Sequence, residues 1–210
     1  MFSNPTLAGI AQFFTNGGPF MVLLILLSIL SVASIILRAR RLRESAIIPP
    51  EVAAAATALR PGADPRPVLA AIAAHPSAMS SILSTLLSHL DWPRSENLEA
   101  VQTTARHEMA RLEKGLVVLE IATGAGPLLG LLGTLSGLVG IFSTLGGSGD
   151  PVMVARGISE ALNTTIVGLA VAVPSLVAYS YFQRRIEMAA VEMESIAGDL
   201  LSKLYRPAAR

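Results

Sequence analysis

The sequence predicts an all-α integral membrane protein with three transmembrane helices, the second and third extended into the cytoplasm and accompanied by short cytoplasmic helices. Three observations predict this class: a deficit of charge, three long uncharged runs, and cations clustered at one end of each run. Of the 210 residues, 52% are hydrophobic and only 15% are charged, against about 25% charged in soluble domains. The formal net charge of +1 gives no general attraction for nucleic acid. The lack of cysteine excludes disulfides, thiolate metal sites and thiol nucleophiles.

Each uncharged run is long enough for one membrane crossing, which takes about 20 helical residues. No charged residue occurs in residues 1–37, in the 29 residues 121–149 or in the 23 residues 161–183. A cleavable signal peptide is the alternative for the first run, but this run lacks a basic start and is longer than the roughly 7–15 apolar residues of a signal peptide. The three spans are placed near Pro19–Leu37, Thr123–Leu145 and Ala161–Phe182.

Positive charges predict the orientation of the spans, because cytoplasmic loops carry an excess of Lys and Arg. Four arginines follow the first span within six positions, basic residues precede the second and follow the third, and the opposite side holds only Arg156. The N-terminus is therefore predicted outside and the C-terminus in the cytoplasm. The predicted order is an outer segment (1–18), the first span (19–37), a cytoplasmic helical segment running into the second span (38–115), the second span (116–145), an outer loop (146–160), the third span (161–182) and a cytoplasmic helical tail (183–210).

The cytoplasmic segments are predicted to be helices separated by proline-rich breakers. The Ala- and Leu-rich stretches EVAAAATALR and SILSTLLSHL are predicted to form short helices. Beyond Pro93, apolar residues recur every three or four positions over 98–119, and a similar stripe follows the third span over 186–204. Both stripes are predicted to lie on helices continuous with the second and third spans and to line a cavity. Each must be buried against something, and neighbouring subunits are candidates.

Five glycines of the second span are spaced by four, three, four and three residues, which places them on one narrow helix face. Glycine in a helix interior costs roughly 1 kcal/mol relative to alanine, so an aligned set needs a reason. Close approach of two helices in lipid is the usual one, either in a groove within one subunit or in a seam between subunits of an oligomer. The residues are Gly126, Gly130, Gly133, Gly137 and Gly140.

Two threonines at mid-depth are candidates for the lining of an ion pathway, Thr134 in the second span and Thr165 in the third. A single threonine in a membrane helix usually bonds its own backbone, but two at matched depth on adjacent spans fit a lined pathway better. Glu160 is the acid at the outer end of the third span, and it is either functional or a simple charge at a helix N-terminus. The third span also has one small or polar face: Thr165, Gly168, Ala172, Ser175 and Tyr179.

The spans lack any titratable residue near the membrane midplane, so a partner would have to supply the carboxylate if the protein conducts protons. The histidines fall in the predicted cytoplasmic segment, where surface or packing roles are expected. The segment Gly133–Gly137 could pass for an intramembrane serine protease motif, but no membrane histidine could act as its base. The sequence GGSGD lacks a P-loop lysine. We therefore expect no enzyme activity, metal or cofactor.

Two segments resemble a known family. Residues 126–138, GPLLGLLGTLSGL, and residues 157–174, GISEALNTTIVGLAVAVP, are similar to the second- and third-span signatures of the MotA/TolQ/ExbB proton-channel family. Three spans rather than four favour its ExbB/TolQ branch over its flagellar stator branch. The resemblance covers about 60 residues, with the expected short outer loop between the two signatures.

The resemblance implies a homopentamer in the bacterial inner membrane that encloses the membrane helices of two ExbD/TolR-like partner chains. A partner Asp would carry the proton, and the output would reach a TonB- or TolA-like transducer. The family's pore threonines fall on Thr134 and Thr165 and its third-span Glu on Glu160, while Pro127 and Pro174 match its prolines. The sequence departs from the family at Leu135 and Ser136, where relatives often have an aromatic residue, and at Asn163. The alternatives are a sodium-driven member, a non-conducting membrane scaffold and a solute transporter, against which three spans without an internal repeat argue.

Overall fold

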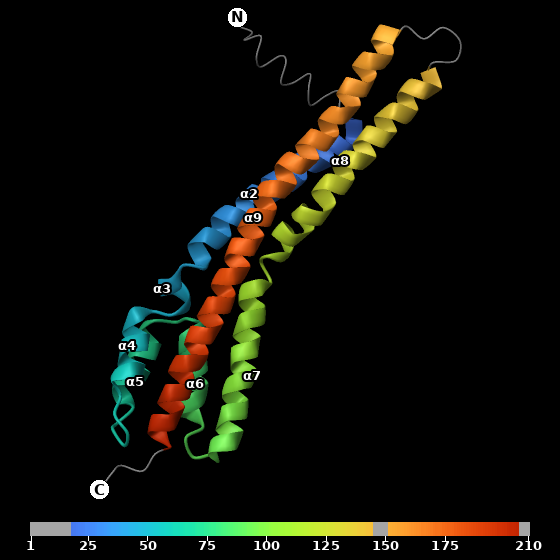
Figure 1. Cartoon of the computed structure of the whole chain (residues 1–210). Helices are drawn as coiled ribbons and strands as arrows, with labels where there is room; N and C mark the ends of the chain where they lie inside the picture. Colours follow the sequence, from blue (N-terminus) through green and yellow to red (C-terminus); the bar gives the residue numbers. More distant parts are fainter. Residues whose placement is uncertain (1–17, 145–150, 206–210) are drawn as a thin grey trace, which may run out of the picture. The chain divides into compact units, whose positions relative to one another are not determined.

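The computed structural model describes residues 18–144 and 151–205, and every regular element in these ranges is an α-helix (Figure 1). Three helices are long and apolar enough to cross a membrane: α2 (Gly18–Arg41), α8 (Val117–Thr144) and α9 (Pro151–Leu204). This confirms the predicted all-α class with three membrane helices. The predicted outer segment lies outside the described residues, apart from Gly18.

The chain divides into two compact units. The span unit comprises residues up to 36 together with 116–180, and the bundle unit comprises residues 37–115 together with those from 181 onward. Helices α2 and α9 each contribute to both units.

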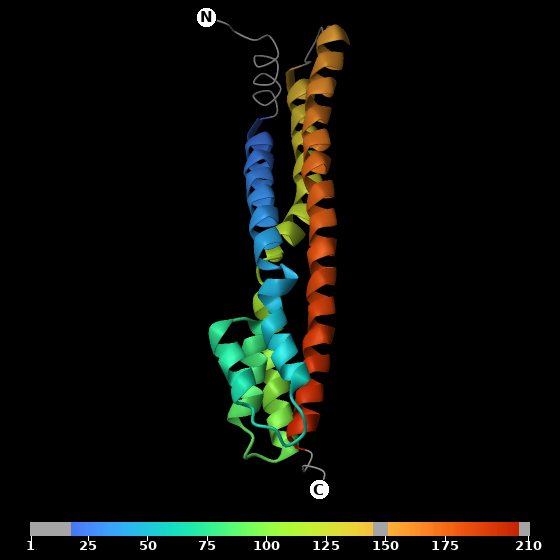
Figure 2. The ribbon, with the colours of Figure 1, turned by 90° about the vertical axis from the view of Figure 1, so that its left-hand side faces the viewer.

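In the span unit, α2 has one buried face and a broad exposed apolar surface. Met21 and Leu24 are fully buried, whereas Leu26 and Ile29 are more than half exposed, as expected for a helix that faces lipid on most sides. The hydroxyl of Ser31 forms a 2.5 Å hydrogen bond with that of Ser175 on α9, and both side chains are buried. Figure 2 shows α2 beside the α8 and α9 helices of this unit.

Helix α9 begins ten residues before the predicted third span, so the predicted outer loop 146–160 is helical from Pro151 onward. Proline suits the first turn of a helix because its missing N–H has no intrahelical acceptor there. Both family-motif prolines, Pro127 and Pro174, lie inside helices. Membrane helices tolerate such prolines where neighbouring helices satisfy the freed backbone groups.

In the described residues, the bundle unit contains five short or medium helices and the ends of α2 and α9. Proline marks several helix starts: Pro50 and Pro67 occupy the first turn of their helices, and Pro93 is the N-cap of another. The helices are α3 (Glu44–Ile47), α4 (Pro50–Ala58), α5 (Arg66–Ala74), α6 (Ala78–Ser88) and α7 (Arg94–Glu113). The two predicted short helices are present, and two further helices, α3 and α5, lie before the first proline breaker and between two later ones.

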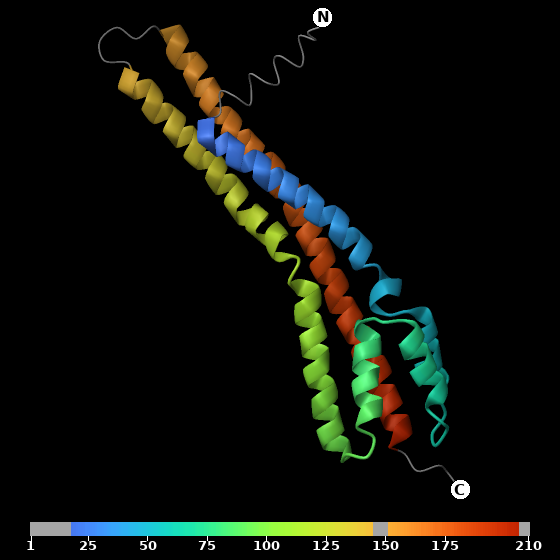
Figure 3. The same ribbon diagram turned by 180° about the vertical axis from the view of Figure 1, so that it is seen from behind.

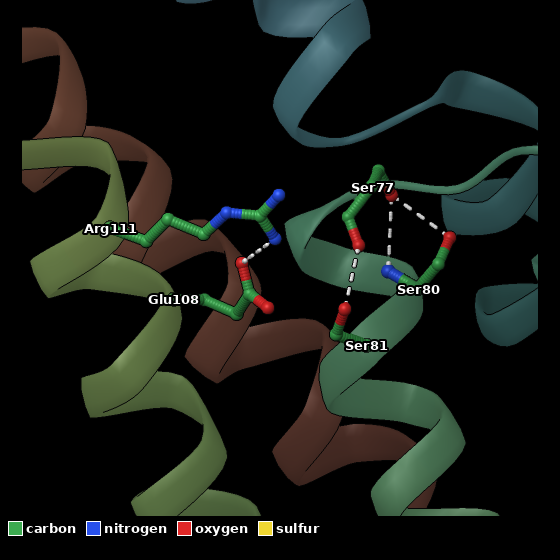
Figure 4. A network of polar contacts seen from close by, with 5 residues as sticks. All are labelled: Ser77, Ser80, Ser81, Glu108 and Arg111. Atoms are coloured by element: carbon green, nitrogen blue, oxygen red, sulfur yellow. Dashed lines mark hydrogen bonds and ion pairs between the residues drawn. The ribbon is translucent and has the colours of Figure 1, made fainter.

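Side-chain hydrogen bonds fix the start of α6 (Figure 4). The Ser77 hydroxyl accepts a 3.1 Å hydrogen bond from the Ser80 backbone N–H, which is the usual role of an N-cap serine. The Ser81 hydroxyl donates to the Ser77 carbonyl at 3.2 Å.

On α7, Glu108 and Arg111 form an ion pair at 3.6 Å. Figure 3 shows α6 and α7 side by side, joined by a short turn.

The apolar stripes of α7 and of the end of α9 line a cavity of about 660 Å³ within the bundle unit. On α7 the lining includes Leu98, Val101 and Met109, and on α9 it includes Ala190, Met193 and Ala197. On the same stripe of α9, next to these lining residues, Ile186 and Leu200 are at most 1% exposed. The two predicted stripes therefore do border one cavity.

The stripe 98–119 does not form one continuous helix with the second span, which corrects the prediction. Helix α7 ends at Glu113, residues 114–116 form a turn, and α8 begins at Val117. The space at Gly115 is occupied by a residue far away in the sequence, because a Cβ atom at this position would overlap the guanidinium of Arg38.

The end of α9 is tied to the turn between α6 and α7. The Tyr205 hydroxyl donates to the backbone carbonyl of Trp92 at 2.9 Å and accepts from Nδ2 of Asn97 at 3.0 Å. Asn97 is completely buried and also donates to the carbonyl of Leu86, one of the carbonyls that α6 leaves without an intrahelical partner. These bonds hold the last turn of α9 on the bundle.

We expect Tyr205→Phe to destabilise the bundle unit by about 0.5–1.5 kcal/mol, because it removes a hydroxyl that both donates and accepts. Limited proteolysis of the detergent-purified protein should then release the end of α9 faster. Tyr181→Phe is the matched control, since Tyr181 is exposed and its hydroxyl only accepts from Arg185. Free trimming of residues 186–204 from the unsubstituted protein would contradict the packing described here.

Candidate functional site

The candidate site lies where α8 and α9 approach each other most closely within the span unit. The two helices run antiparallel there, since Gly126 faces Gly168 whereas Gly137, further along α8, faces Ala161, earlier in α9. A Cβ atom at Gly168 would lie 2.5 Å from the backbone oxygen of Gly126. One at Gly130 would lie 2.9 Å from the Cα of Thr165. The helices are therefore in backbone contact that no larger residue permits.

Four of the five aligned glycines of α8 contact α9 of the same chain. Besides Gly126 and Gly130, a Cβ atom at Gly133 would lie 2.7 Å from Oγ1 of Thr164, and one at Gly137 would lie 2.8 Å from the Cβ of Ala161. A Cβ atom at Gly140 would meet nothing within 4 Å. The glycine face thus forms a groove for α9 within one chain, and a seam between subunits stays a prediction.

Three threonine hydroxyls meet in this groove, and we call Thr134, Thr164 and Thr165 the threonine cluster. The hydroxyl oxygens of Thr134 and Thr165 are 2.5 Å apart. The Thr164 hydroxyl donates to the carbonyl of Ala161 at 2.8 Å and lies 3.5 Å from that of Thr134. All three hydroxyls are within 3.2 Å of the carbonyl oxygen of Gly130. The two threonines proposed from the sequence are thus brought together.

The protein itself can satisfy all hydroxyl protons of the threonine cluster. Thr164 can donate to Ala161, Thr134 to Gly130 in the preceding turn, and Thr165 to the oxygen of Thr134. The bond from Thr134 to its own helix is the local pattern expected of a single membrane threonine. In this arrangement the oxygen of Thr165 accepts no hydrogen bond from the other two hydroxyls.

Exposure separates the members of the threonine cluster. The side chains of Thr134 and Thr164 are buried, at 8% and 1% exposure, whereas Thr165 is half-buried. A hydroxyl can donate one hydrogen bond and accept two. Thr165 is therefore the member that can exchange hydrogen bonds with a group outside the α8–α9 pair.

The remaining candidate residues have different positions. Glu160 lies within α9, but its side chain is outside the described part of the structure. Gly168, Ala172 and Ser175, on the predicted small or polar face, are buried, while Tyr179 is only half-buried. Thr164 is not among the site residues predicted from the sequence. Gly133 leaves the space that the Thr164 side chain occupies, so its place on the glycine face is the signal that could have indicated a buried neighbour. In the described ranges, no group of three His, Asp or Glu side chains is arranged to hold a metal ion.

Comparison with known proteins shows that the part of the chain with the threonine cluster matches a known family. Residues 74–195 match the MotA/TolQ/ExbB proton channel family, a range that includes both threonine-bearing segments and all five glycines. The chain is 30% identical over 191 residues to a putative biopolymer transport protein ExbB homolog of Methanothermobacter thermautotrophicus, an alignment covering 89% of this chain and 68% of that protein.

Two shorter alignments agree with the family match. The chain is 37% identical over 114 residues to a putative biopolymer transport protein ExbB-like 1 of Synechocystis sp., covering 51% of this chain and 44% of the relative. It is 29% identical over 113 residues to the Tol-Pal system protein TolQ of Haemophilus influenzae, covering 53% and 50%. The chain thus spans about half or less of the length of these two relatives. By the family match and by these relatives, the chain belongs to the MotA/TolQ/ExbB proton channel family, in its ExbB/TolQ branch.

Proposed function

We propose that this chain is the ring-forming subunit of a proton channel that, with an ExbD/TolR-like single-span partner, converts proton motive force into mechanical work on a TonB- or TolA-like transducer. In this proposal five copies enclose a partner dimer in the bacterial inner membrane, with the N-terminus outside and the C-terminus in the cytoplasm. The chain makes and breaks no covalent bonds; it moves ions.

The observation that carries the proposal is the half-buried hydroxyl of Thr165, backed at 2.5 Å by the buried hydroxyl of Thr134. Since no titratable residue lies in the middle of the α8 and α9 spans, a partner carboxylate carries the proton. Threonine hydroxyls offer that carboxylate polar contacts without a fixed charge that would trap it.

The geometry allows the Thr165 hydroxyl to act in both directions. Opposite a charged carboxylate, Thr165 donates outward and its oxygen accepts the proton of Thr134. Opposite a protonated carboxyl group, Thr165 accepts from the acid and turns its own proton to Thr134 or to the Gly130 carbonyl, 3.2 Å away. Both protonation states of the partner are then served by hydroxyl rotation alone, with no movement of α8 or α9.

A sodium-driven channel is the second candidate, because five oxygen atoms gather at the site: three hydroxyls and the carbonyls of Gly130 and Ala161. These oxygens lie 2.5–3.5 Å from one another wherever a bond joins them and are already engaged in mutual hydrogen bonds. This arrangement favours proton transport over sodium transport, because a sodium ion could bind only if several of these oxygens gave up their mutual hydrogen bonds at the same time.

The ion assignment is tested by collapsing the two gradients separately in cells that express this chain with its partner. A protonophore should abolish the energy-dependent activity of the system, whereas a sodium-selective ionophore in sodium-containing medium should leave it intact. Activity that survives the protonophore and follows sodium would overturn the proton assignment. Activity that is unchanged by both treatments would exclude a role driven by protons or by sodium and leave a structural role.

A further inference from the structure

A second feature of the chain, unrelated to the threonine cluster, is the position of Arg38 in the bundle unit. Its guanidinium lies against Gly115, in the turn between α7 and α8, where any Cβ atom would overlap its Nη2 and Cζ atoms. The side chain of Arg38 is therefore seated in a space that only a glycine leaves open.

Backbone conformation does not explain this glycine. Among the described residues, positive φ angles occur only at Gly18 and Gly62, so Gly115 adopts a conformation that other residues also adopt. The space it leaves for Arg38 is the feature that an alanine would remove. Because the overlapping atoms belong to the end of a flexible side chain, an alanine would displace the guanidinium without forcing the backbone apart.

The guanidinium of Arg38 has no anionic partner among the described residues. No carboxylate there lies within 4.0 Å of Arg38, Arg41 or Lys114, and no hydrogen bond joins Arg38 to a backbone carbonyl. Arg41 follows three residues later on the same helix face, and Lys114 adjoins Gly115 in the chain. Within the described ranges, five basic residues have acidic partners and several exposed arginines, such as Arg40, do not, so the distinguishing feature of Arg38 is its seat on Gly115.

The sequence places these cations at the edge of the apolar layer. Arg38 directly follows the uncharged run 1–37, and Gly115 lies two residues before the first residue of α8. Headgroup phosphates of phospholipids lie at this depth, and a guanidinium can bind two phosphate oxygens at once.

We propose that Arg38, seated on Gly115 and accompanied by Arg41 and Lys114, forms a binding site for the phosphate of an anionic phospholipid. The general preference of cytoplasmic loops for positive charge requires only that cations be present. A seat for one particular guanidinium indicates a defined site. The alternative is that Arg38 merely interacts with the C-terminal dipole of α7, which would stabilise the protein whether or not lipid is present.

The test measures lipid binding to the detergent-purified protein by native mass spectrometry, and thermal stability in parallel. The additions are phosphatidylglycerol, phosphatidylcholine or inorganic phosphate. We expect phosphatidylglycerol alone to remain bound and to raise the unfolding temperature. An equal effect of inorganic phosphate would show that the site binds soluble anions and not lipid. An equal effect of phosphatidylcholine, which has a phosphate but no net charge, would overturn the proposed preference for anionic lipid.

Three variants identify the residues responsible. Arg38→Gln should lower the affinity for phosphatidylglycerol at least about tenfold, as expected for the loss of a charge-assisted pair. Gly115→Ala should lower it as well, although it removes no charge. Arg40→Gln, the matched control, removes the same charge from another face of the same helix, and should change the affinity by no more than about fivefold. Equal losses in Arg38→Gln and Arg40→Gln, or full binding by Gly115→Ala, would overturn the proposal.

Discussion

Gly130→Leu should separate α8 from α9 and prevent native assembly of the protein. A Cβ atom at this position would lie 2.9 Å from both the carbonyl oxygen of Thr164 and the Cα of Thr165, which are backbone atoms that no rotamer change can move. The rest of the leucine side chain would force the helices further apart. Overpacking alone costs about 1–3 kcal/mol, and the loss of the hydrogen bonds in the threonine cluster would add to it.

The cysteine-free sequence allows this separation to be measured without background. Gly126→Cys and Ala172→Cys together should form a disulfide within one chain, because their Cβ atoms would be 3.3 Å apart across the groove, close to the usual separation in a disulfide. Gly130→Leu should abolish this cross-link. Gly124→Leu is the matched control, since a Cβ atom at Gly124 meets nothing within 4 Å on the same helix. A cross-link that joins two chains would show that the glycine face is a seam between subunits.

Thr165→Val should remove most of the ion-driven activity while leaving assembly intact. Valine has nearly the same shape as threonine but lacks the hydroxyl, so a charged partner carboxylate would lose its donor. A hydrogen bond to a charged group contributes about 1.5–3 kcal/mol, which corresponds to a loss of roughly 10- to 100-fold in rate. Thr134→Val should have a similar effect, because it removes the group that reverses the Thr165 bond. Ion flux or transducer-dependent activity in cells is the measurement.

Thr164→Val provides the control within the same cluster. It also removes one hydroxyl, but that hydroxyl is buried and bonds the Ala161 carbonyl in its own helix. It should therefore retain most activity, and Thr165→Ser should retain a good part because the hydroxyl is kept. Wild-type activity in both Thr134→Val and Thr165→Val would end the proposed role of the hydroxyls, even if the chain still forms a ring.

The limits of the sequence reasoning are clearest at the helix boundaries. The absence of charge predicts that the third span begins after Arg156 and Glu160, whereas α9 already begins at Pro151. Charge excludes a residue from hydrocarbon but does not break a helix, since the helix requires only its own backbone hydrogen bonds. The same holds for α2 and α8: α2 continues to Arg41 past the predicted end at Leu37, and α8 begins at Val117, before the charged residue Glu120 and the start at Thr123 that the uncharged run predicts.

Contacts between distant segments were beyond the sequence pattern. The apolar stripe continues from Leu112 through Leu116 and so favours one continuous helix, although Gly115 after the basic residue Lys114 is a typical signal for a helix end. The structure places Arg38 there, and only the tertiary fold shows this. The pair Thr134 and Thr165 was predictable because the position of each threonine within its uncharged run gives its depth in the membrane, and the two depths match. The carbonyl of Gly130, on which the three hydroxyls converge, carries no side chain and leaves no mark in the sequence.

The backbone contact between α8 and α9 also has a mechanical consequence. Gly126, Gly130 and Gly168 leave no side chains at the contact that could take up new rotamers, so a shift along either helix axis would drive a larger residue into a main chain. The pair is a stiff strut with a single register. We expect movement of the pair to occur at its exposed apolar surface, which includes Leu128, Val139 and Phe142, because apolar contacts there can be exchanged without breaking hydrogen bonds.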